Sequence, residues 1–154
     1  MVETGSLAPD FTLVGDDNTP FTLSEHRGRR LLLVFYPGDD TPVCTRQFCD
    51  YRDGIESFAE LGVDVVGINP AGLESHRRFR EKHDLPFKLL SDPDLEVARA
   101  YGCKGILGVK RAVFLVDEQG VVRYAFVEAL AMFRRTAEEL VAVINELDSE
   151  AAES

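Results

Sequence analysis

A cysteine lies in the first turn of a predicted helix, directly after an apolar run. Residues 35–49 read Phe-Tyr-Pro-Gly-Asp-Asp-Thr-Pro-Val-Cys-Thr-Arg-Gln-Phe-Cys. Thr41 is the predicted N-cap, whose side-chain oxygen would accept a backbone N–H, and Pro42 suits the first helical position because its fixed φ is helical. Cys44 then faces unpaired N–H groups and the positive end of the helix dipole, surroundings that lower a cysteine pKa from about 8.5. The stretch therefore predicts a reactive thiolate.

The segments around this stretch predict alternating strands and helices. Alternating or continuous short apolar runs predict strands, whereas apolar residues spaced three and four apart predict helices. The predicted strands cover residues 8–14, 20–23, 31–36, 63–69, 87–91, 112–116 and 121–127, and the predicted helices cover residues 42–61, 73–83, 93–101 and 133–147. Residues 24–28 predict one helical turn, 102–108 a glycine-rich loop, and 148–154 a polar, frayed tail.

These elements predict how the cysteine is held. Strand 31–36, helix 42–61 and strand 63–69 form a βαβ unit. Strands 112–116 and 121–127 form a hairpin, and strands 8–14 and 20–23 form another at the N-terminus. A βαβ unit followed by further helices and an antiparallel hairpin predicts an α/β fold, with a central mixed sheet and helices on both faces.

Composition and charge exclude several classes of protein. The chain has 154 residues and is 45% hydrophobic, enough for one core, so we expect a single domain over residues 1–154. Its 27 acidic and 17 basic residues give a formal charge of -10, which argues against nucleic acid or an anionic membrane as a partner. The sequence shows no secretory signal and no membrane span, so we expect a cytoplasmic protein.

Residues 37–44, Pro-Gly-Asp-Asp-Thr-Pro-Val-Cys, resemble the Pro-x-x-x-Thr-x-x-Cys motif of the peroxiredoxins, which are thiol peroxidases with a thioredoxin fold. Residues 8–13 before the motif, residues 35–37 leading into it and residues 111–117 after it are similar to family blocks in the same order. Cys49, five residues after Cys44, is arranged as in the bacterioferritin comigratory protein (Q-type) subfamily. The resemblance spans nearly the whole chain and implies a thioredoxin-like fold.

Peroxide reduction needs a thiolate that attacks one oxygen while donors stabilise the charge that grows on the other. The resemblance implies that Cys44 is this nucleophile and that Arg111 contacts both the thiolate and the peroxide. The planar donor fork of Arg111 suits two acceptors, whereas Lys110 beside it has the alternative role of a solvated charge. Thr41 offers a hydroxyl one turn from the thiol, and Pro37 is placed to shield the pocket.

Cys49 is too far from Cys44 to bond in an intact helix. Five helical residues advance about 7.5 Å, past the Cα limit of about 7 Å for a disulfide, and the two side chains point about 140° apart. If Cys49 resolves a sulfenic acid on Cys44, as the resemblance implies, residues 42–51 must unwind. The alternative is that Cys49 is a buried apolar residue.

The remaining cysteine and the histidines are expected to have no chemical role. Cys103 lies in a short loop, where we expect a packing residue, although Lys104 beside it could lower its pKa. His26, His76 and His83 lie among charged residues, so we expect them to be exposed and to act neither as ligands nor as bases. The spacing of cysteines and histidines fits no metal site, and no metal or organic cofactor is implied.

One residue departs from the peroxiredoxin pattern, and two acidic residues near Cys44 would oppose thiolate formation. Many relatives have Glu three residues after the reactive cysteine, where Gln47 stands here, and an amide carries no charge to balance an arginine. Asp39 and Asp40 add negative charge near the cysteine, and we expect both to point into solvent.

The function predicted from these features is a thiol-dependent peroxidase. Cys44 would reduce hydrogen peroxide or an organic hydroperoxide, and the resulting sulfenic acid would condense with Cys49. Thioredoxin or a similar dithiol would restore the thiols, and the subfamily resemblance favours a monomer. The alternatives are a single-cysteine peroxidase, a redox sensor and a thiol–disulfide exchange protein. Thr41 and Arg111 distinguish a peroxidase from an exchange protein, which needs neither and favours a Cys-x-x-Cys pair.

Overall fold

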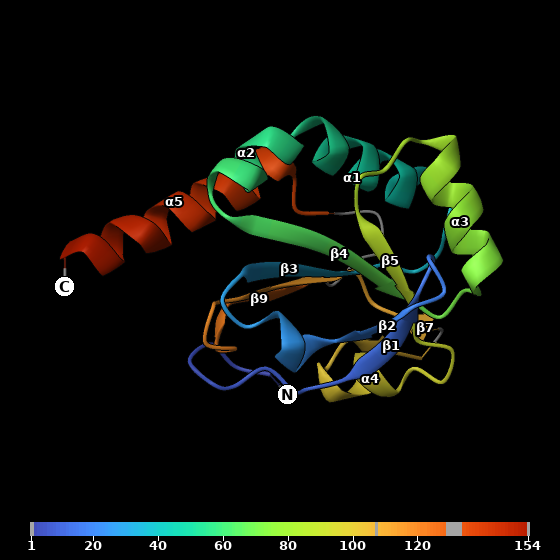
Figure 1. Ribbon diagram of the computed structural model, residues 1–154, viewed down its shortest axis with the longest axis horizontal. Coiled ribbons are helices and arrows are strands. Elements are labelled where there is room, and N and C mark those ends of the chain that lie inside the picture. Colours follow the sequence, from blue (N-terminus) through green and yellow to red (C-terminus); the bar gives the residue numbers. More distant parts are fainter. Residues whose placement is uncertain (1, 107, 129–133, 154) are drawn as a thin grey trace.

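The computed structural model describes residues 2–106, 108–128 and 134–153. Within them, seven strands form one mixed sheet in the order β2-β1-β5-β4-β3-β8-β9 (Figure 1). The strands of this sheet are β1 (Thr12–Gly15), β2 (Pro20–Thr22), β3 (Arg30–Phe35), β4 (Val63–Asn69), β5 (Lys88–Ser91), β8 (Ala112–Val116) and β9 (Val122–Val127). The short strands β6 (Lys104–Gly105) and β7 (Gly108–Val109) pair with each other.

Strands β3, β4 and β5 are parallel, whereas β8 lies antiparallel to β3 and to β9. Strand β1 pairs antiparallel with both β2 and β5. The predicted mixed sheet, the βαβ unit and both hairpins are therefore confirmed.

Helices cover both faces of the sheet, because the central strands are apolar on both sides. One face carries α1 (Pro42–Asp53), α2 (Ile55–Glu60), α3 (Leu73–Lys82) and α5 (Ala137–Glu153), and the other carries α4 (Glu96–Ala100) (Figure 1). A hydrophobic core lies on each face of the sheet, and alternate residues of β3 belong to one or the other. Leu32 and Val34 pack toward α1, while Leu33 and Phe35 pack toward α4. A 3-10 helix, η1 (Leu23–His26), stands at the predicted helical turn.

The helix predicted over residues 93–101 is shorter, as α4 (Glu96–Ala100), and two other helices differ more from their predicted bounds. The helix expected over residues 42–61 is divided at Gly54 into α1 and α2. A Cβ added at Gly54 would lie 3.0 Å from the Cβ of Ala137, so α5 packs directly against this glycine. The frayed tail expected from residue 148 is wrong, because α5 continues to Glu153. The predicted start of this helix at Phe133 lies outside the described residues.

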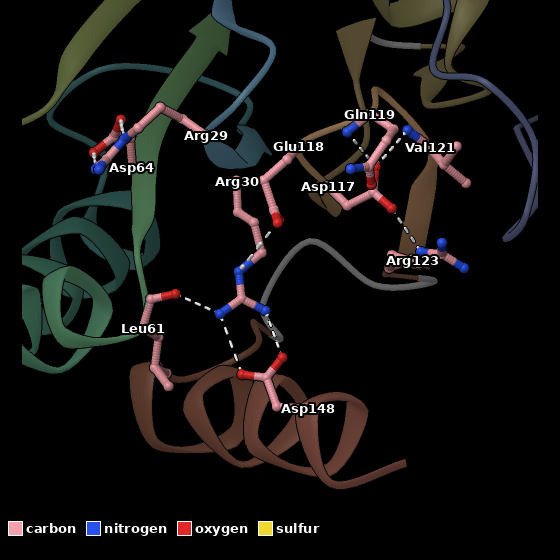
Figure 2. Close-up of polar contacts among 10 residues, drawn as sticks. All are labelled: Arg29, Arg30, Leu61, Asp64, Asp117, Glu118, Gln119, Val121, Arg123 and Asp148. Carbon is pink, nitrogen blue, oxygen red and sulfur yellow. Dashed lines mark hydrogen bonds and ion pairs between the residues drawn. The ribbon is translucent and has the colours of Figure 1, made fainter. Parts of the chain in front are cut away.

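Helix α5 is held at both ends by polar contacts. At its start, Asp50 of α1 accepts a hydrogen bond from the backbone N–H of Ala137 at 2.8 Å. Further along, Arg30 at the start of β3 pairs with Asp148 at 2.8 Å and also donates to the Leu61 carbonyl (Figure 2). Helix α5 is therefore tied to α1 at its start and, through Asp148, to the start of β3.

Figure 2 also shows the turn between β8 and β9, which the sequence predicted at residues 117–120. The Asp117 carboxylate accepts hydrogen bonds from the N–H groups of Gln119 and Val121 and pairs with Arg123 at 2.8 Å. Gly120 has a φ of 83°, a conformation that favours glycine. The Asp117 side chain thus closes this turn.

Candidate active site

Cys44 lies at the carboxyl end of β3, in the first turn of α1. Its side chain is fully buried, and a hydrogen bond of 2.8 Å from the Thr45 N–H to the Thr41 carbonyl closes the turn. The predicted side-chain cap by Thr41 is wrong: its hydroxyl turns back to the loop and donates to the Gly38 carbonyl at 3.3 Å. That bond is longer than the usual 2.7–2.8 Å, so the hydroxyl is held loosely.

The cation predicted for this thiol is in contact with it. Arg111 is 3% exposed, and its Nη1 lies 3.1 Å from Cys44 Sγ and 2.6 Å from Gln47 Oε1. The sheet explains this placement, because Ala112 of β8 pairs with Phe35 of β3, so Arg111 lies where β3 ends. The guanidinium therefore places a fixed positive charge beside the buried sulfur.

A chain of hydrogen bonds continues from the guanidinium to the start of α5. Gln47 accepts from Arg111 and donates through Nε2 to the Tyr51 hydroxyl at 3.0 Å, and Tyr51 donates to the Arg135 carbonyl at 2.7 Å. Burial raises the pKa of Tyr51, so the phenol keeps its proton. Arginine can only donate and a carbonyl can only accept, so the direction of every bond in the chain is fixed. Gln47 therefore holds Arg111 without a charge of its own.

The other two cysteines lie in different surroundings. Cys44, Cys49 and Cys103, all within the described residues, are free thiols. Cys49 is half-buried on the same unbroken helix as Cys44, as its spacing predicts. Cys103 is buried in the core on the α4 side, and burial raises the pKa of its thiol to about 12, which fits the expected packing role.

The loop of residues 37–41 forms the outer edge of the site. Pro37, Asp40 and Thr41 are exposed, and Asp40 pairs with Lys82 at 2.7 Å and with His83 at 3.1 Å. Asp40 thus points outward, as expected. That Pro37 shields the thiol stays a prediction.

Two expectations about this region are wrong. The Asp39 side chain is 4% exposed and does not point into solvent, and His76 is fully buried. The two side chains contact each other at 2.7 Å. The sequence does carry a signal for His76, because it precedes Phe79 by three residues and so shares the inward face of α3. His26 and His83 are half-buried.

A large cleft lies away from this site. It has a volume of about 780 Å³ and is lined by residues that include Arg30, Glu118 and Asp148, at the opposite end of β3 from Cys44 (Figure 2). Each of these three side chains takes part in an ion pair there. None of the helices within the described residues has the length and apolar character needed to span a membrane.

Comparison with known proteins agrees with this geometry. Peroxiredoxin Bcp of Bacillus subtilis is 42% identical over 127 residues, which cover 77% of this chain and 81% of that protein. The crystal structure of peroxidoxin BcpB from Mycobacterium tuberculosis has a TM-score of 0.87 at 31% identity, covering 96% and 99% of the two chains. The bacterioferritin comigratory protein of Xanthomonas campestris has a TM-score of 0.82 at 28% identity, covering 98% of each chain.

The match to the family as a whole extends over residues 4–125, which include the whole of the Cys44 segment, Arg111 and all seven strands of the sheet except the end of β9. The similar structures confirm the thioredoxin-like fold. The chain belongs to the AhpC/TSA family, and among its members it is a peroxiredoxin of the Bcp and Q type, a thiol-dependent peroxidase.

Proposed function

We propose that Cys44 is the nucleophile of this peroxidase and that Arg111, Thr41 and Pro37 complete its site. The observation that carries this proposal is the buried guanidinium of Arg111, 3.1 Å from the Cys44 sulfur. A fixed, buried cation stabilises an anionic sulfur and the negative charge that develops on the peroxide. A packing cysteine needs no such partner, as Cys103 illustrates.

In the first step, the thiolate attacks one oxygen of the hydroperoxide. The S–O bond forms as the O–O bond breaks, and the departing oxygen takes a proton and leaves as water or an alcohol. Arg111 and the backbone N–H groups of the first turn of α1 stabilise that oxygen while it carries charge. The loosely held Thr41 hydroxyl is available to hydrogen-bond the peroxide, and Pro37 limits the entry of water.

In the second step, Cys49 attacks the sulfenic sulfur of Cys44, a disulfide forms, and the sulfenic oxygen leaves as water. Both cysteines are on α1, so residues 42–51 must unwind for the sulfurs to meet. Because α1 ends at Gly54, the unwinding need not extend into α2. A dithiol such as thioredoxin then reduces the disulfide.

The substrates proposed are hydrogen peroxide and organic hydroperoxides. The similar structure from Xanthomonas campestris was determined in work on alkyl peroxide reduction, which supports the organic class. The net charge of -10 supports a protein that acts apart from nucleic acid and membranes. We infer that residues 1–154 act as one domain, as a monomer and in the cytoplasm.

The test adds one equivalent of hydrogen peroxide to the reduced protein and follows peroxide loss, free thiols and the disulfide map by mass spectrometry. We expect rapid peroxide loss and a Cys44–Cys49 disulfide. Cys44→Ser should abolish the reaction, Cys49→Ser should leave a sulfenic or sulfinic acid on Cys44, and the control Cys103→Ser should behave as wild type. Peroxide that persists with Cys44 still a thiol would refute the proposal, and a disulfide to Cys103 would refute the role of Cys49.

A further inference from the structure

We propose that Asp39 and His76 are positioning residues, which hold the loop of residues 37–41 against α3 so that Cys44 and Thr41 face Arg111. The inference rests on the proposed role of Cys44. Neither residue contacts the thiol through a hydrogen bond, and the mechanism above uses neither.

The Asp39 carboxylate gathers hydrogen bonds from three elements of the fold. Its Oδ1 accepts from the Tyr36 hydroxyl at 2.6 Å and from Asn69 Nδ2 at 3.2 Å, and its Oδ2 lies 2.7 Å from both Ser75 Oγ and His76 Nδ1. These partners belong to the end of β3, the end of β4 and α3. A single side chain of the loop is thus fastened to the sheet and to a helix.

The protons in this cluster can be assigned from the partners. His76 Nε2 lies 3.0 Å from the Leu90 carbonyl, which can only accept, so Nε2 carries a hydrogen. Asn69 Oδ1 accepts from the Ala71 N–H, which turns the Asn69 amide nitrogen toward Asp39. Tyr36, Asn69 and Ser75 are therefore all donors to Asp39, which favours its carboxylate form. The contact between Asp39 and His76 is buried and hydrogen-bonded on both sides of the ring.

The electrostatics of Asp39 agree with this assignment. Burial raises the pKa of Asp39, but the hydrogen bonds from His76, Tyr36 and Ser75 outweigh it, so the pKa lies below its usual range. The carboxylate also raises the pKa of Tyr36, after burial itself, so the phenol remains a donor. Tyr36 thus stays a hydrogen-bond donor, and the Asp39 carboxylate stays the acceptor.

The Asp39 side chain is buried, unlike its neighbours in the loop. Pro37, Asp40 and Thr41 are exposed, and the second link from the loop to α3, between Asp40 and Lys82, lies at the surface. Exposed ion pairs contribute little, whereas a buried pair that loses one partner is costly. Asp39 is therefore the residue that fixes the loop.

The position of the loop matters because it leads into α1. Thr41 comes two residues after Asp39, and Cys44 comes five residues after it, whereas the backbone at Arg111 is positioned by the pairing of β8 with β3. A shift of the loop therefore moves Thr41 and the thiol relative to Arg111. A displacement of about 1 Å in a reacting group can slow a reaction about 100-fold.

The test measures the second-order rate constant of the reduced protein with hydrogen peroxide, by rapid quench and mass spectrometry. We expect Asp39→Ala to lower this constant about 100-fold. Asp39→Asn should recover most of the loss, because the amide keeps the shape of the side chain, can hydrogen-bond His76 and can still accept from Tyr36. The matched control Asp40→Asn removes the exposed link, keeps a residue that tolerates the φ of 60° at this position, and should react as wild type.

A purely structural role predicts a different result. Asp39→Ala would then lower the melting temperature, yet the folded protein would react as fast as Asp40→Asn, and this outcome would overturn the proposal. If Asp39→Ala does not fold, Ser75→Ala removes a single donor and should still slow the reaction more than Asp40→Asn does. Cys44→Ser in the same assay tests the proposed nucleophile separately, because residual peroxide reaction in that variant would refute the nucleophile whatever Asp39 does.

Discussion

Replacing Tyr51 with phenylalanine tests whether the hydrogen-bonded chain behind Arg111 affects the reaction proposed at Cys44. The variant keeps the buried ring and removes only the hydroxyl. That hydroxyl accepts a hydrogen bond from Gln47 and donates one to the Arg135 carbonyl. The substitution therefore leaves a donor and an acceptor without their partner.

The expected loss of stability follows from these two bonds. A buried polar group without its hydrogen bond costs about 1–3 kcal/mol. The Arg135 carbonyl is only part-buried, so water can replace some of its bond, and we expect a total of about 2 kcal/mol. In a chain of this size, each kcal/mol lowers the melting temperature by about 2–4 °C, so the melting temperature should fall by about 4–8 °C.

The rate should fall as well, because Gln47 loses one of the two contacts that fix its amide, and Arg111 then loses part of its alignment. We expect a rate constant with hydrogen peroxide about tenfold lower, which corresponds to about 1.4 kcal/mol of barrier. The chain has no tryptophan, so rapid quench with alkylation and mass spectrometry is a better assay than intrinsic fluorescence.

Tyr101→Phe is the matched control for this substitution. The Tyr101 hydroxyl donates to the Pro9 carbonyl at 2.7 Å, and its ring lies in the core on the other face of the sheet. This control should lose stability and keep the wild-type rate constant. Equal rate constants for the two variants would refute a role of the Tyr51 chain at the thiol, and an unchanged melting temperature in Tyr51→Phe would refute the assignment of its two bonds.

Three further outcomes are expected. Gly67→Ala should destabilise the fold by about 1–3 kcal/mol in urea unfolding, because a Cβ there would lie 2.8 Å from the Leu89 side chain and 3.0 Å from the Phe48 ring, and overpacking has costs of that order. A wild-type midpoint would show that both side chains can shift to make room. The lowered pKa of Asp39 means that its ionised form adds stability above the unfolded pKa of about 3.9 and that this stability is lost as the pH falls through the folded value. The difference in unfolding free energy between wild type and Asp39→Asn should therefore shrink in acid, and a constant difference from about pH 6 to about pH 2 would contradict this sign. Cys103, with its pKa raised to about 12 by burial, should be alkylated after Cys49 in the native protein at neutral pH, as a time course of peptide masses would show; earlier labelling of Cys103 would contradict its burial.

The elements that local pattern defines were predictable from the sequence. The strands at residues 63–69 and 112–116 agree with β4 and β8 because continuous apolar runs identify strands that are buried on both faces. The division at Gly54 was not predictable in the same way. The apolar stripe continues through Phe58, and the glycine faces Ala137, which is distant in the sequence.

The candidate site shows the same contrast. Its charge partner was predicted by resemblance, although Arg111 is 67 residues from Cys44 and only the pairing of β8 with β3 brings the two together. His76 was missed because its charged neighbours in the sequence indicated a surface helix. Its burial depends on the rotation of α3 against the sheet, and its pairing with Asp39 depends on the path of the loop, neither of which a local pattern defines.

The contacts of α1 with the start of α5 connect the C-terminal helix to the proposed disulfide. Asp50 and Tyr51 provide two of the bonds that hold the start of α5, and both lie in the segment that the proposed disulfide requires to unwind. Arg30 holds Asp148 from outside that segment. Oxidation would therefore remove these two bonds, while Arg30 and the buried side chains of Leu140 and Ile144 still hold the helix. The start of α5, a helix of 17 residues and about 25 Å, would then respond to the oxidation state of one sulfur atom.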